Sequence, residues 1–206
     1  MFIHSCKSIH RHLALKASHD LKDKGLEVGV SNSYTELLKK LHASLGIPTE
    51  YLNQCDQSLC FQPNELVDTE PDYFGRPQRL APKTFDAWSR MKRSAASDGI
   101  VFFMVSAFRD PQYQHDLIAR KIEQGLSLQE ILRVNAAPGF SEHHTGRAID
   151  IGTYDCEILE ENFEKTAAFE WLQDNAGNFG FSMSYPRDNA AGFTYEPWHW
   201  CFKSID

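Results

Sequence analysis

Three short segments of this chain concentrate the side chains that carry chemistry, and each lies where a predicted strand meets chain-breaking residues. The segments are SAFRD at 106–110, SEHHTGRAID at 141–150 and EPWHW at 196–200. The ends of strands on a rigid scaffold are common places for binding and catalytic residues. Residues this far apart in the sequence act together only when they meet in space. The fold is therefore expected to bring the three segments to one place.

Two histidines and one aspartate in these segments have the chemistry of a zinc site. A catalytic zinc takes three protein ligands and keeps a fourth position open for water. His143 and Asp150 are seven residues apart, with Gly146 between them to let the chain turn, and His199 follows 49 residues later. In the predicted strand AIDIG, Asp150 shares a face with small residues, so an ion can approach it. Two imidazoles and one carboxylate leave the ion a residual positive charge, which lowers the pKa of a bound water towards ~7.

Glu196 and Arg109 have the properties of catalytic groups beside such an ion. Pro197 lacks an N–H and interrupts regular strand pairing, so Glu196 and His199 are able to face the same cavity. Glu196 then has the position of a general base for water. Arg109 supplies a fixed positive charge for an oxyanion that develops during the reaction.

Each of these residues also has an interpretation without chemistry. His144 competes with its neighbour as a ligand, although we interpret it as a second-shell or solvated residue. Asp150 fits a loop cap as well as a ligand. Arg109 and Asp110 fit the start of a helix, because Asp before Pro111 is a common N-cap with proline at the first helical position. Only the three segments taken together favour a metal site.

Composition limits the class of protein. The chain has 28 acidic and 21 basic residues and a net charge of −7, which argues against a nucleic-acid-binding protein. It is 42% hydrophobic and 24% charged, as a folded domain requires. We find no apolar run near the ~20 residues of a membrane span. The length fits one domain of ~100–200 residues better than several.

The five cysteines contain no CxxC pair, so free thiols are expected, with a Cys55–Cys60 loop as the alternative. Four histidines fall in residues 1–24, where a solvated extension is favoured over a metal-binding tail. The start of the chain shows no pattern of a secretion signal. The compartment stays open between the cell envelope and the cytoplasm.

Hydrophobic periodicity and breakers predict an α+β fold, with a small antiparallel sheet and helices packed on one side. The predicted helices cover residues 33–45, 83–97, 111–124, 127–134 and 165–176, and the predicted strands cover 100–108, 148–152, 181–185 and 193–202. The first of these helices begins with a capping box of Ser33 and Glu36. Residues 46–82 are expected to form a long surface connection. We therefore expect a core domain at 81–206 that follows an N-terminal extension, helix and connection at 1–80.

The motifs also resemble a known family. The pattern S-x-H-x-x-G-x-A-x-D at 141–150, followed by E-P-W-H at 196–199, is similar to the VanY-type D-alanyl-D-alanine carboxypeptidases and the related L,D-carboxypeptidases. The S-x-F-R element at 106–109 and Gln114 fit this pattern, as does W-L-x-x-N-A-x-x-F-G-F at 171–181. The resemblance covers roughly residues 80–202. In the family Phe108 is commonly a tyrosine, so details of substrate contact are expected to differ.

The resemblance implies roles for individual residues and a groove in the sheet that holds one zinc ion per chain. The implied zinc ligands are His143, Asp150 and His199. The implied catalytic residues are Glu196 as base and Arg109 as oxyanion stabiliser. The implied substrate-binding residues are Ser141, Gln114, Ser106 and Trp198.

The expected function is that of a monomeric zinc metallopeptidase that removes a C-terminal D-amino acid, D-alanine, from a peptidoglycan stem peptide or muropeptide. One alternative is a peptidoglycan endopeptidase of the same zinc class. Another is a non-catalytic zinc-containing binding module. Glu196 and Arg109 argue against a purely structural site, which needs neither and closes its fourth position with protein. The choice between D,D and L,D specificity stays open.

Overall fold

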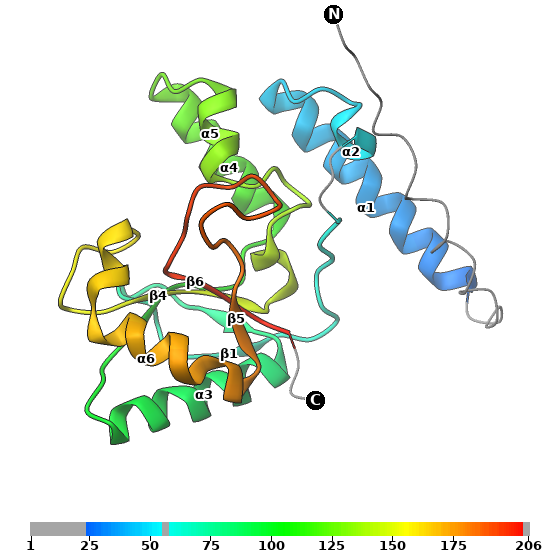
Figure 1. The fold of residues 1–206 in the computed structure, drawn as a ribbon. Coiled ribbons are helices and arrows are strands. Elements are labelled where there is room, and N and C mark those ends of the chain that lie inside the picture. Colours follow the sequence, from blue (N-terminus) through cyan, green and yellow to red (C-terminus); the bar gives the residue numbers. More distant parts are fainter. Residues whose placement is uncertain (1–23, 55–57, 204–206) are drawn as a thin grey trace, which may run out of the picture. The chain divides into compact units, whose positions relative to one another are not determined.

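The computed structural model describes residues 24–54 and 58–203 (Figure 1). The chain divides after Leu37 into two compact units, and the sheets, the cores and the candidate site described below belong to the second unit, from Leu38 onward. Helix α1 (Lys24–Leu45) crosses this division, so only its C-terminal part is considered with the second unit. The domain boundary expected near residue 80 stays a prediction. None of the helices in the described ranges is both long and apolar enough to cross a bilayer.

A four-stranded antiparallel sheet forms the centre of the second unit, which confirms the α+β class (Figure 1). Its strands run in the order β3 (Phe103–Ser106), β4 (Ala148–Gly152), β6 (His199–Phe202) and β5 (Phe181–Met183). A separate two-stranded sheet pairs β1 (Val67–Asp68) with β2 (Arg79–Leu80). The central strand β4 is buried along its whole length. It is the strand that carries the predicted metal ligand Asp150.

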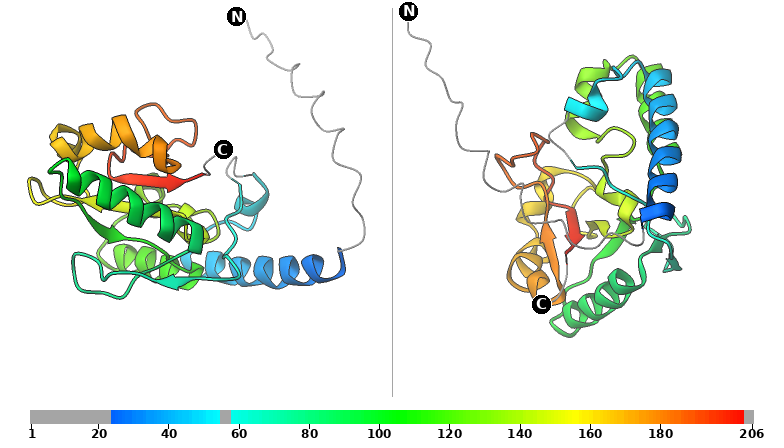
Figure 2. Two further views of the ribbon diagram at one scale, coloured as in Figure 1. Left: turned by 90° about the horizontal axis from the view of Figure 1, so that it is seen from below. Right: turned by 90° about the vertical axis from the view of Figure 1, so that its right-hand side faces the viewer.

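Helices α3 (Pro82–Ser97) and α6 (Ala167–Asn175) pack against one face of this sheet (Figures 1 and 2). Ile149 and Ile151 of β4 point into this hydrophobic core and are completely buried. Successive side chains of a strand point to opposite faces, so Asp150 lies on the other face. Alternation thus separates the core from the polar site within one strand.

A second apolar cluster joins the C-terminal end of α1 to helices α4 (Pro111–Glu123) and α5 (Leu128–Val134). Both helices were predicted within a residue of these bounds, and their starts explain why. Asp110 caps α4 by accepting from the Tyr113 N–H, and α5 begins with a capping box of Ser127 and Glu130. The short helices complete the fold: α2 (Tyr51–Gln54), η1 (Glu142–Thr145), η2 (Glu161–Lys165) and η3 (Ala176–Phe179).

Several expected boundaries are wrong. Helix α1 begins at Lys24, so Ser33 and Glu36 lie inside it and form no capping box at its start. The strand expected at 100–108 covers only 103–106, since Val101 is 59% exposed and does not pair. The strand expected at 193–202 covers only 199–202, and Pro197, which cannot donate to a ladder, lies before it.

The segment 46–82 is more ordered than a surface connection. Asp72 is 5% exposed, and its carboxylate accepts hydrogen bonds from the Phe74 and Arg76 N–H groups, from Arg76 Nε and from Gln78 Nε2. The Tyr73 N–H also donates to the Met104 carbonyl of β3. Asp72 therefore fixes the turn at 72–78, and the Tyr73 N–H ties this turn to the edge strand β3.

Cys156 and Cys201 are free thiols in the described part of the chain. This confirms the expectation for these two. Cys55, the partner in the alternative disulfide loop, lies outside the described residues, as do the histidine-rich residues of 1–23.

His42 is a buried residue that makes stability depend on pH. It is 1% exposed, its Nε2–H donates to the Pro138 carbonyl at 2.7 Å, and its ring packs on Tyr51 and Phe140. Burial lowers its pKa below the usual 6.5, so the unfolded chain takes up a proton before the folded chain does. The contribution of the neutral His42 ring to the unfolding free energy is therefore fully present above pH 6.5 and falls as the pH drops below that value.

His42→Gln tests this dependence, because glutamine keeps a donor at the Nε2 position but does not titrate. We expect the variant to lose about 1–3 kcal/mol of unfolding free energy at pH 8, because glutamine cannot replace the packing of the ring. Between pH 8 and pH 5 its stability should fall less than that of the wild type. Urea unfolding at the two pH values measures both quantities. An equal fall in both proteins would contradict the assignment to His42.

Candidate active site

Asp150 and His199 are placed opposite each other by the register of two neighbouring strands. Strand β4 pairs with β6 so that Asp150 faces His199 directly, on the sheet face away from the helical core. Directly opposed side chains on one face have Cβ atoms ~4.5–5.5 Å apart. Asp150 Oδ1 lies 3.0 Å from His199 Nδ1, and the two residues are 5% and 3% exposed.

His143 reaches the same point from helix η1. Its Nδ1–H donates to the Ala107 carbonyl at 2.5 Å, and because a carbonyl only accepts, the lone pair lies on Nε2. That buried Nε2 has no hydrogen-bond partner among the described residues, although Asp150 Oδ2 lies 3.3 Å away. Burial, assisted by the positive charge of Arg109, lowers the pKa of His143 to about 4. The ring is therefore neutral and its lone pair is available near neutral pH.

These three side chains fit a divalent metal ion. One ligand atom of each of His143, Asp150 and His199 lies within 4.8 Å of the others. Ligands ~2.1 Å from a tetrahedral zinc are ~3.4 Å apart, close to the observed 3.3 and 3.0 Å between Asp150 and the two histidines. The structure therefore brings together the three residues that the sequence predicts as ligands, and the unpartnered Nε2 has the chemistry of a metal ligand.

His199 would exchange a proton for the metal. Carboxylates face both of its ring nitrogens, and although burial lowers its pKa, the hydrogen bonds of Asp150 and Glu142 raise it to about 9. Ligation requires a neutral imidazole. A cation at Nδ1 therefore competes with a proton at that atom.

His144 is neither solvated nor able to bind a metal through a free nitrogen. It is completely buried, its Nδ1–H donates to the Arg109 carbonyl at 2.6 Å, and its Nε2 accepts from the Gly139 N–H at 3.0 Å. Both ring nitrogens are therefore used by the backbone. Of the two expected roles, the solvated one is wrong and that of a residue supporting the ligands fits these contacts. His144 instead fixes the main chain of Arg109, whose own N–H donates to the His143 carbonyl.

Glu196 lies next to the three candidate ligands. Its Oε2 is 3.8 Å from His199 Nδ1, and its side chain is 14% exposed. The His199 N–H donates to the Glu196 carbonyl, which closes a tight turn around Pro197. Burial raises the pKa of Glu196 to about 7, against the attraction of His199. A carboxyl group with this pKa is suited to accept and return a proton near neutral pH.

A small cavity of about 30 Å³ opens onto this site. Six of the predicted site residues line it: Arg109, Gln114, Ser141, His143, Glu196 and His199. Gln114 is buried and donates from Nε2 to the Ala136 carbonyl, which leaves Oε1 without a partner in the described chain. Arg109 Nε is likewise buried and unpartnered there. Buried polar groups are nearly always satisfied, so two such groups at a cavity wall are suited to bind a polar ligand.

Other lining residues were missed by sequence reasoning. The cavity is completed by Val134, Asn135, Ala136, Tyr185 and Phe193. The ring of Tyr185 lies 4.7 Å from that of His199 and 4.9 Å from that of Phe193. These residues lie at a helix end or in irregular segments, where no hydrophobic period marks them. Phe193, three residues before the EPWH motif, is the one residue of this set whose position in the sequence could have indicated the site.

Two predicted substrate-binding residues lie outside the cavity. Ser106 is in β3, where it pairs with Asp150 across the sheet, and Trp198 packs against the hydrophobic core. Neither is among the residues that line the cavity. Their contact with substrate stays a prediction.

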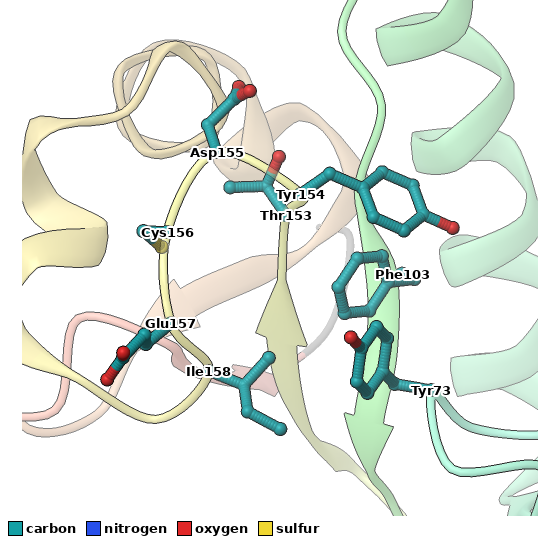
Figure 3. Close-up of a pocket in the computed structure, with 8 residues that line it drawn as sticks. All are labelled: Tyr73, Phe103, Thr153, Tyr154, Asp155, Cys156, Glu157 and Ile158. Carbon is teal, nitrogen blue, oxygen red and sulfur yellow. The ribbon is translucent and has the colours of Figure 1, made fainter.

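A larger hollow of about 580 Å³ follows the end of β4 (Figure 3). Stacked rings of Tyr73 and Phe103 form one wall, and the loop 153–158 forms the other. Its residues include none of the predicted site residues. The smaller cavity, not the larger one, therefore holds the groups that can perform chemistry.

Gly146 permits the turn between His143 and Asp150. Its φ of 64° is in the left-handed region, and a Cβ there would lie 2.9 Å from the Ala81 nitrogen and 2.9 Å from a methyl group of Leu66. We expect Gly146→Ala to cost about 1–2 kcal/mol in backbone strain and about 1–3 kcal/mol in overpacking. Gly177→Ala is the matched control, because it has neither a positive φ nor an atom within 4 Å. Equal unfolding midpoints in urea for the two variants would contradict this account.

Comparison with known proteins agrees with this geometry. Residues 77–205, more than half of the chain, match the family model of VanY, D-alanyl-D-alanine carboxypeptidase. The chain belongs to the VanY family. This match spans all three motif segments and therefore all three candidate metal ligands.

Individual members of the VanY family are similar at a moderate level. The bifunctional D-Ala-D-Ala dipeptidase and carboxypeptidase VanXYC of Enterococcus gallinarum is 31% identical over 132 residues, which cover 61% of this chain and 68% of that protein. The chain spans between 33% and 68% of the length of the curated relatives it matches.

Solved structures of the VanY family share the fold. The L,D-carboxypeptidase LdcB has a TM-score of 0.63 and 28% identity, with 70% of this chain and 71% of that chain covered. A VanY variant from a VanB-type resistance cassette, solved in complex with Zn(II), has a TM-score of 0.52 and 24% identity, with 74% and 82% covered. The second likeness shows the fold alone.

Proposed function

We propose that this chain is a zinc carboxypeptidase that removes a C-terminal D-alanine from peptidoglycan peptides. The observation that carries the proposal is the convergence of His143, Asp150 and His199 beside the carboxyl group of Glu196. Membership of the VanY family and the Zn(II) complex of a relative support the choice of zinc. The proposal includes one zinc ion per chain and a monomer.

Two imidazoles and one carboxylate would hold the ion, which when bound polarises water and a carbonyl group as a Lewis acid. Glu196 takes the proton from the attacking water in this proposal and returns it to the leaving amine; its pKa of about 7 and its distance of 3.8 Å from His199 Nδ1 support this role. Arg109 contributes a fixed positive charge at the same cavity, where it stabilises the negative charge that develops on the scissile carbonyl oxygen. The backbone of Arg109 is held from both sides by His143 and His144, which fixes the point from which its side chain extends.

The substrate's terminal residue is proposed to bind between Arg109, Gln114 and Ser141. The guanidinium group matches a carboxylate, and the free Oε1 of Gln114 accepts from a peptide N–H. The small size of the cavity, about 30 Å³, argues against a bulky side chain on the terminal residue. The endopeptidase alternative, by contrast, needs a groove that continues on both sides of the scissile bond.

A digest of purified tri-, tetra- and pentapeptide stems tests the proposal. Mass spectrometry should show loss of one alanine residue that is abolished by a zinc chelator and restored by added zinc. Loss from the pentapeptide indicates D,D specificity, and loss from the tetrapeptide indicates L,D specificity. Cleavage inside the chain would instead favour the endopeptidase. A zinc-containing protein that changes no mass would favour the binding module.

A further inference from the structure

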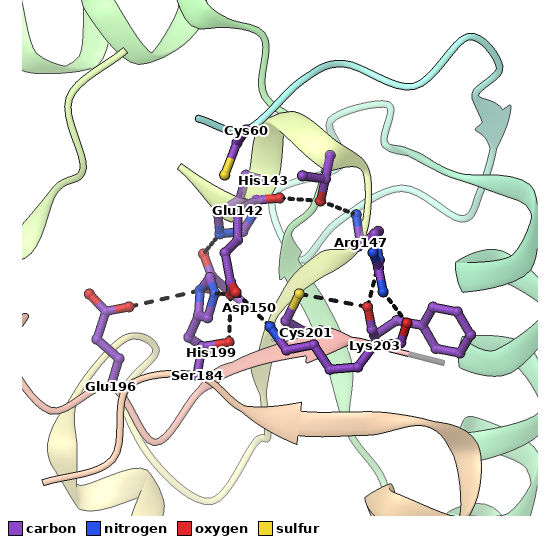
Figure 4. A network of polar contacts seen from close by, with 12 residues as sticks. Cys60, Glu142, His143, Arg147, Asp150, Ser184, Glu196, His199, Cys201 and Lys203 are labelled. Carbon is purple, nitrogen blue, oxygen red and sulfur yellow. Dashed lines mark hydrogen bonds and ion pairs between the residues drawn. The ribbon is translucent and has the colours of Figure 1, made fainter. Parts of the chain in front are cut away.

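Glu142 is adjacent in sequence to His143, but its side chain contacts His199, the other histidine of the candidate metal site. Its Oε2 accepts a hydrogen bond from His199 Nε2–H at 3.0 Å (Figure 4). The other ring nitrogen, Nδ1, faces Asp150 at 3.0 Å. A carboxylate only accepts hydrogen bonds, so the contact places a proton on Nε2 and directs Nδ1 towards the ion.

The carboxylate of Glu142 is itself fixed by further contacts. Its Oε1 accepts from Lys203 Nζ at 2.7 Å, and its Oε2 also accepts from Ser184 Oγ–H at 2.5 Å (Figure 4). Both oxygens of the Glu142 carboxylate therefore accept from donors, and the ammonium group of Lys203 neutralises its charge.

Glu142 cannot be a further ligand of the same ion. It lies beyond Nε2, whereas the ion is expected at Nδ1 on the opposite edge of the ring. Among the residues that the structure describes, the compact group of ligand atoms contains only His143, Asp150 and His199. The simpler alternative is that Glu142 serves only as a stabilising ion pair with Lys203. That role does not require the contact with His199, which is 3% exposed.

We propose that Glu142 is a positioning residue that orients His199 for metal binding, with Ser184 and Lys203 holding its carboxylate. This proposal rests on the zinc site of the proposed function. Partners on the outer nitrogen of a ligating histidine fix its tautomer and orientation, and their loss typically weakens metal binding by about 10–100-fold. Helix η1 then supplies one ligand, His143, and orients the other, so a single four-residue turn sets the geometry of both.

Zinc affinity of the full chain, measured by competition with a chromophoric chelator, tests the role without relying on activity. We expect Glu142→Ala to bind zinc about 10–100-fold more weakly than the wild type. Glu142→Gln should lose less, because its amide oxygen still accepts from His199, and it guards against misfolding of the alanine variant. Glu160→Ala, at an exposed position, is the matched control and should bind as the wild type does.

Lys203→Met separates positioning from simple stabilisation. It removes the ion pair with Glu142 and keeps the contact between Glu142 and His199. Lys203→Met should therefore weaken zinc binding less than Glu142→Ala does. This difference should persist even if the two variants unfold at similar urea concentrations. The ring nitrogen shifts of His199, read by long-range ¹H–¹⁵N NMR of the zinc-loaded protein, should show a protonated Nε2 in the wild type and a changed Nε2 signal in Glu142→Ala.

Zinc affinity of Glu142→Ala within twofold of the wild type would overturn the positioning role, as would equal losses in Glu142→Ala and Lys203→Met. A wild-type chain that binds zinc but releases no D-alanine would contradict the proposed function instead, and the comparison of zinc affinities would still decide the role of Glu142.

Discussion

Glu196→Gln is expected to lower kcat by about 10²–10⁴-fold, the usual contribution of a positioned general base. Glutamine keeps the size and polarity of the side chain but cannot take a proton from water. Because Glu196 is not one of the three candidate ligands, zinc content should stay at the wild-type level. Release of D-alanine from a stem peptide, measured together with bound zinc, checks both expectations.

The control for this variant is Glu160→Gln, which changes an exposed glutamate in the same way. It should keep full turnover and full zinc content. Wild-type kcat in Glu196→Gln would show that another group takes the proton. Loss of zinc in that variant would instead show that Glu196 holds the ion.

Arg109→Lys is expected to lower kcat/KM by about 10²–10³-fold, the effect of losing one preorganised oxyanion donor. Lysine keeps the charge but not the planar fork of donors that matches a carboxylate or an oxyanion. The buried Nε, which has no partner in the described structure, is the group whose contact with substrate should disappear.

The matched control is Arg93→Lys on the exposed surface of α3, which should be silent. A variant Arg109→Lys that raises KM and leaves kcat unchanged would restrict the residue to holding the terminal carboxylate. Full activity would remove Arg109 from the mechanism. The unfolding midpoint should stay close to that of the wild type, because His143 and His144 contact the main chain of this residue and not its side chain.

The sequence predicted the meeting of His143, Asp150 and His199 only from the three motif segments taken together and from their resemblance to a known family. Local rules explain how the first two of these residues are placed. Gly146 marks the turn after the first histidine, and strict alternation in AIDIG separates Asp150 from two core isoleucines. The predicted and observed bounds of α4 and α5 agree for a similar local reason. The side-chain caps at Asp110 and Ser127 lie within three residues of the backbone groups that they satisfy.

Longer-range contacts were beyond such rules. The partner of Glu142 is 57 residues away, and nothing in the sequence near position 142 distinguishes a residue that orients a ligand from an exposed acid. Asp72 folds its own segment through side-chain hydrogen bonds that leave no periodic pattern. The prediction of a strand over 193–202 was wrong in its first half, because apolar and aromatic content does not by itself show that a segment pairs with a neighbouring strand. The chain instead forms a turn at Pro197 before β6 begins.

The direct opposition of Asp150 and His199 across β4 and β6 ties the candidate metal site to strand alignment. A slip of one residue would turn one of these side chains into the apolar interior and would break the donor set at once. A bound ion opposes any such slip, since it favours only the aligned pairing. The metal would therefore act as a check on correct assembly of the sheet as well as a reagent, and chelation should loosen the centre of the molecule before its outer helices.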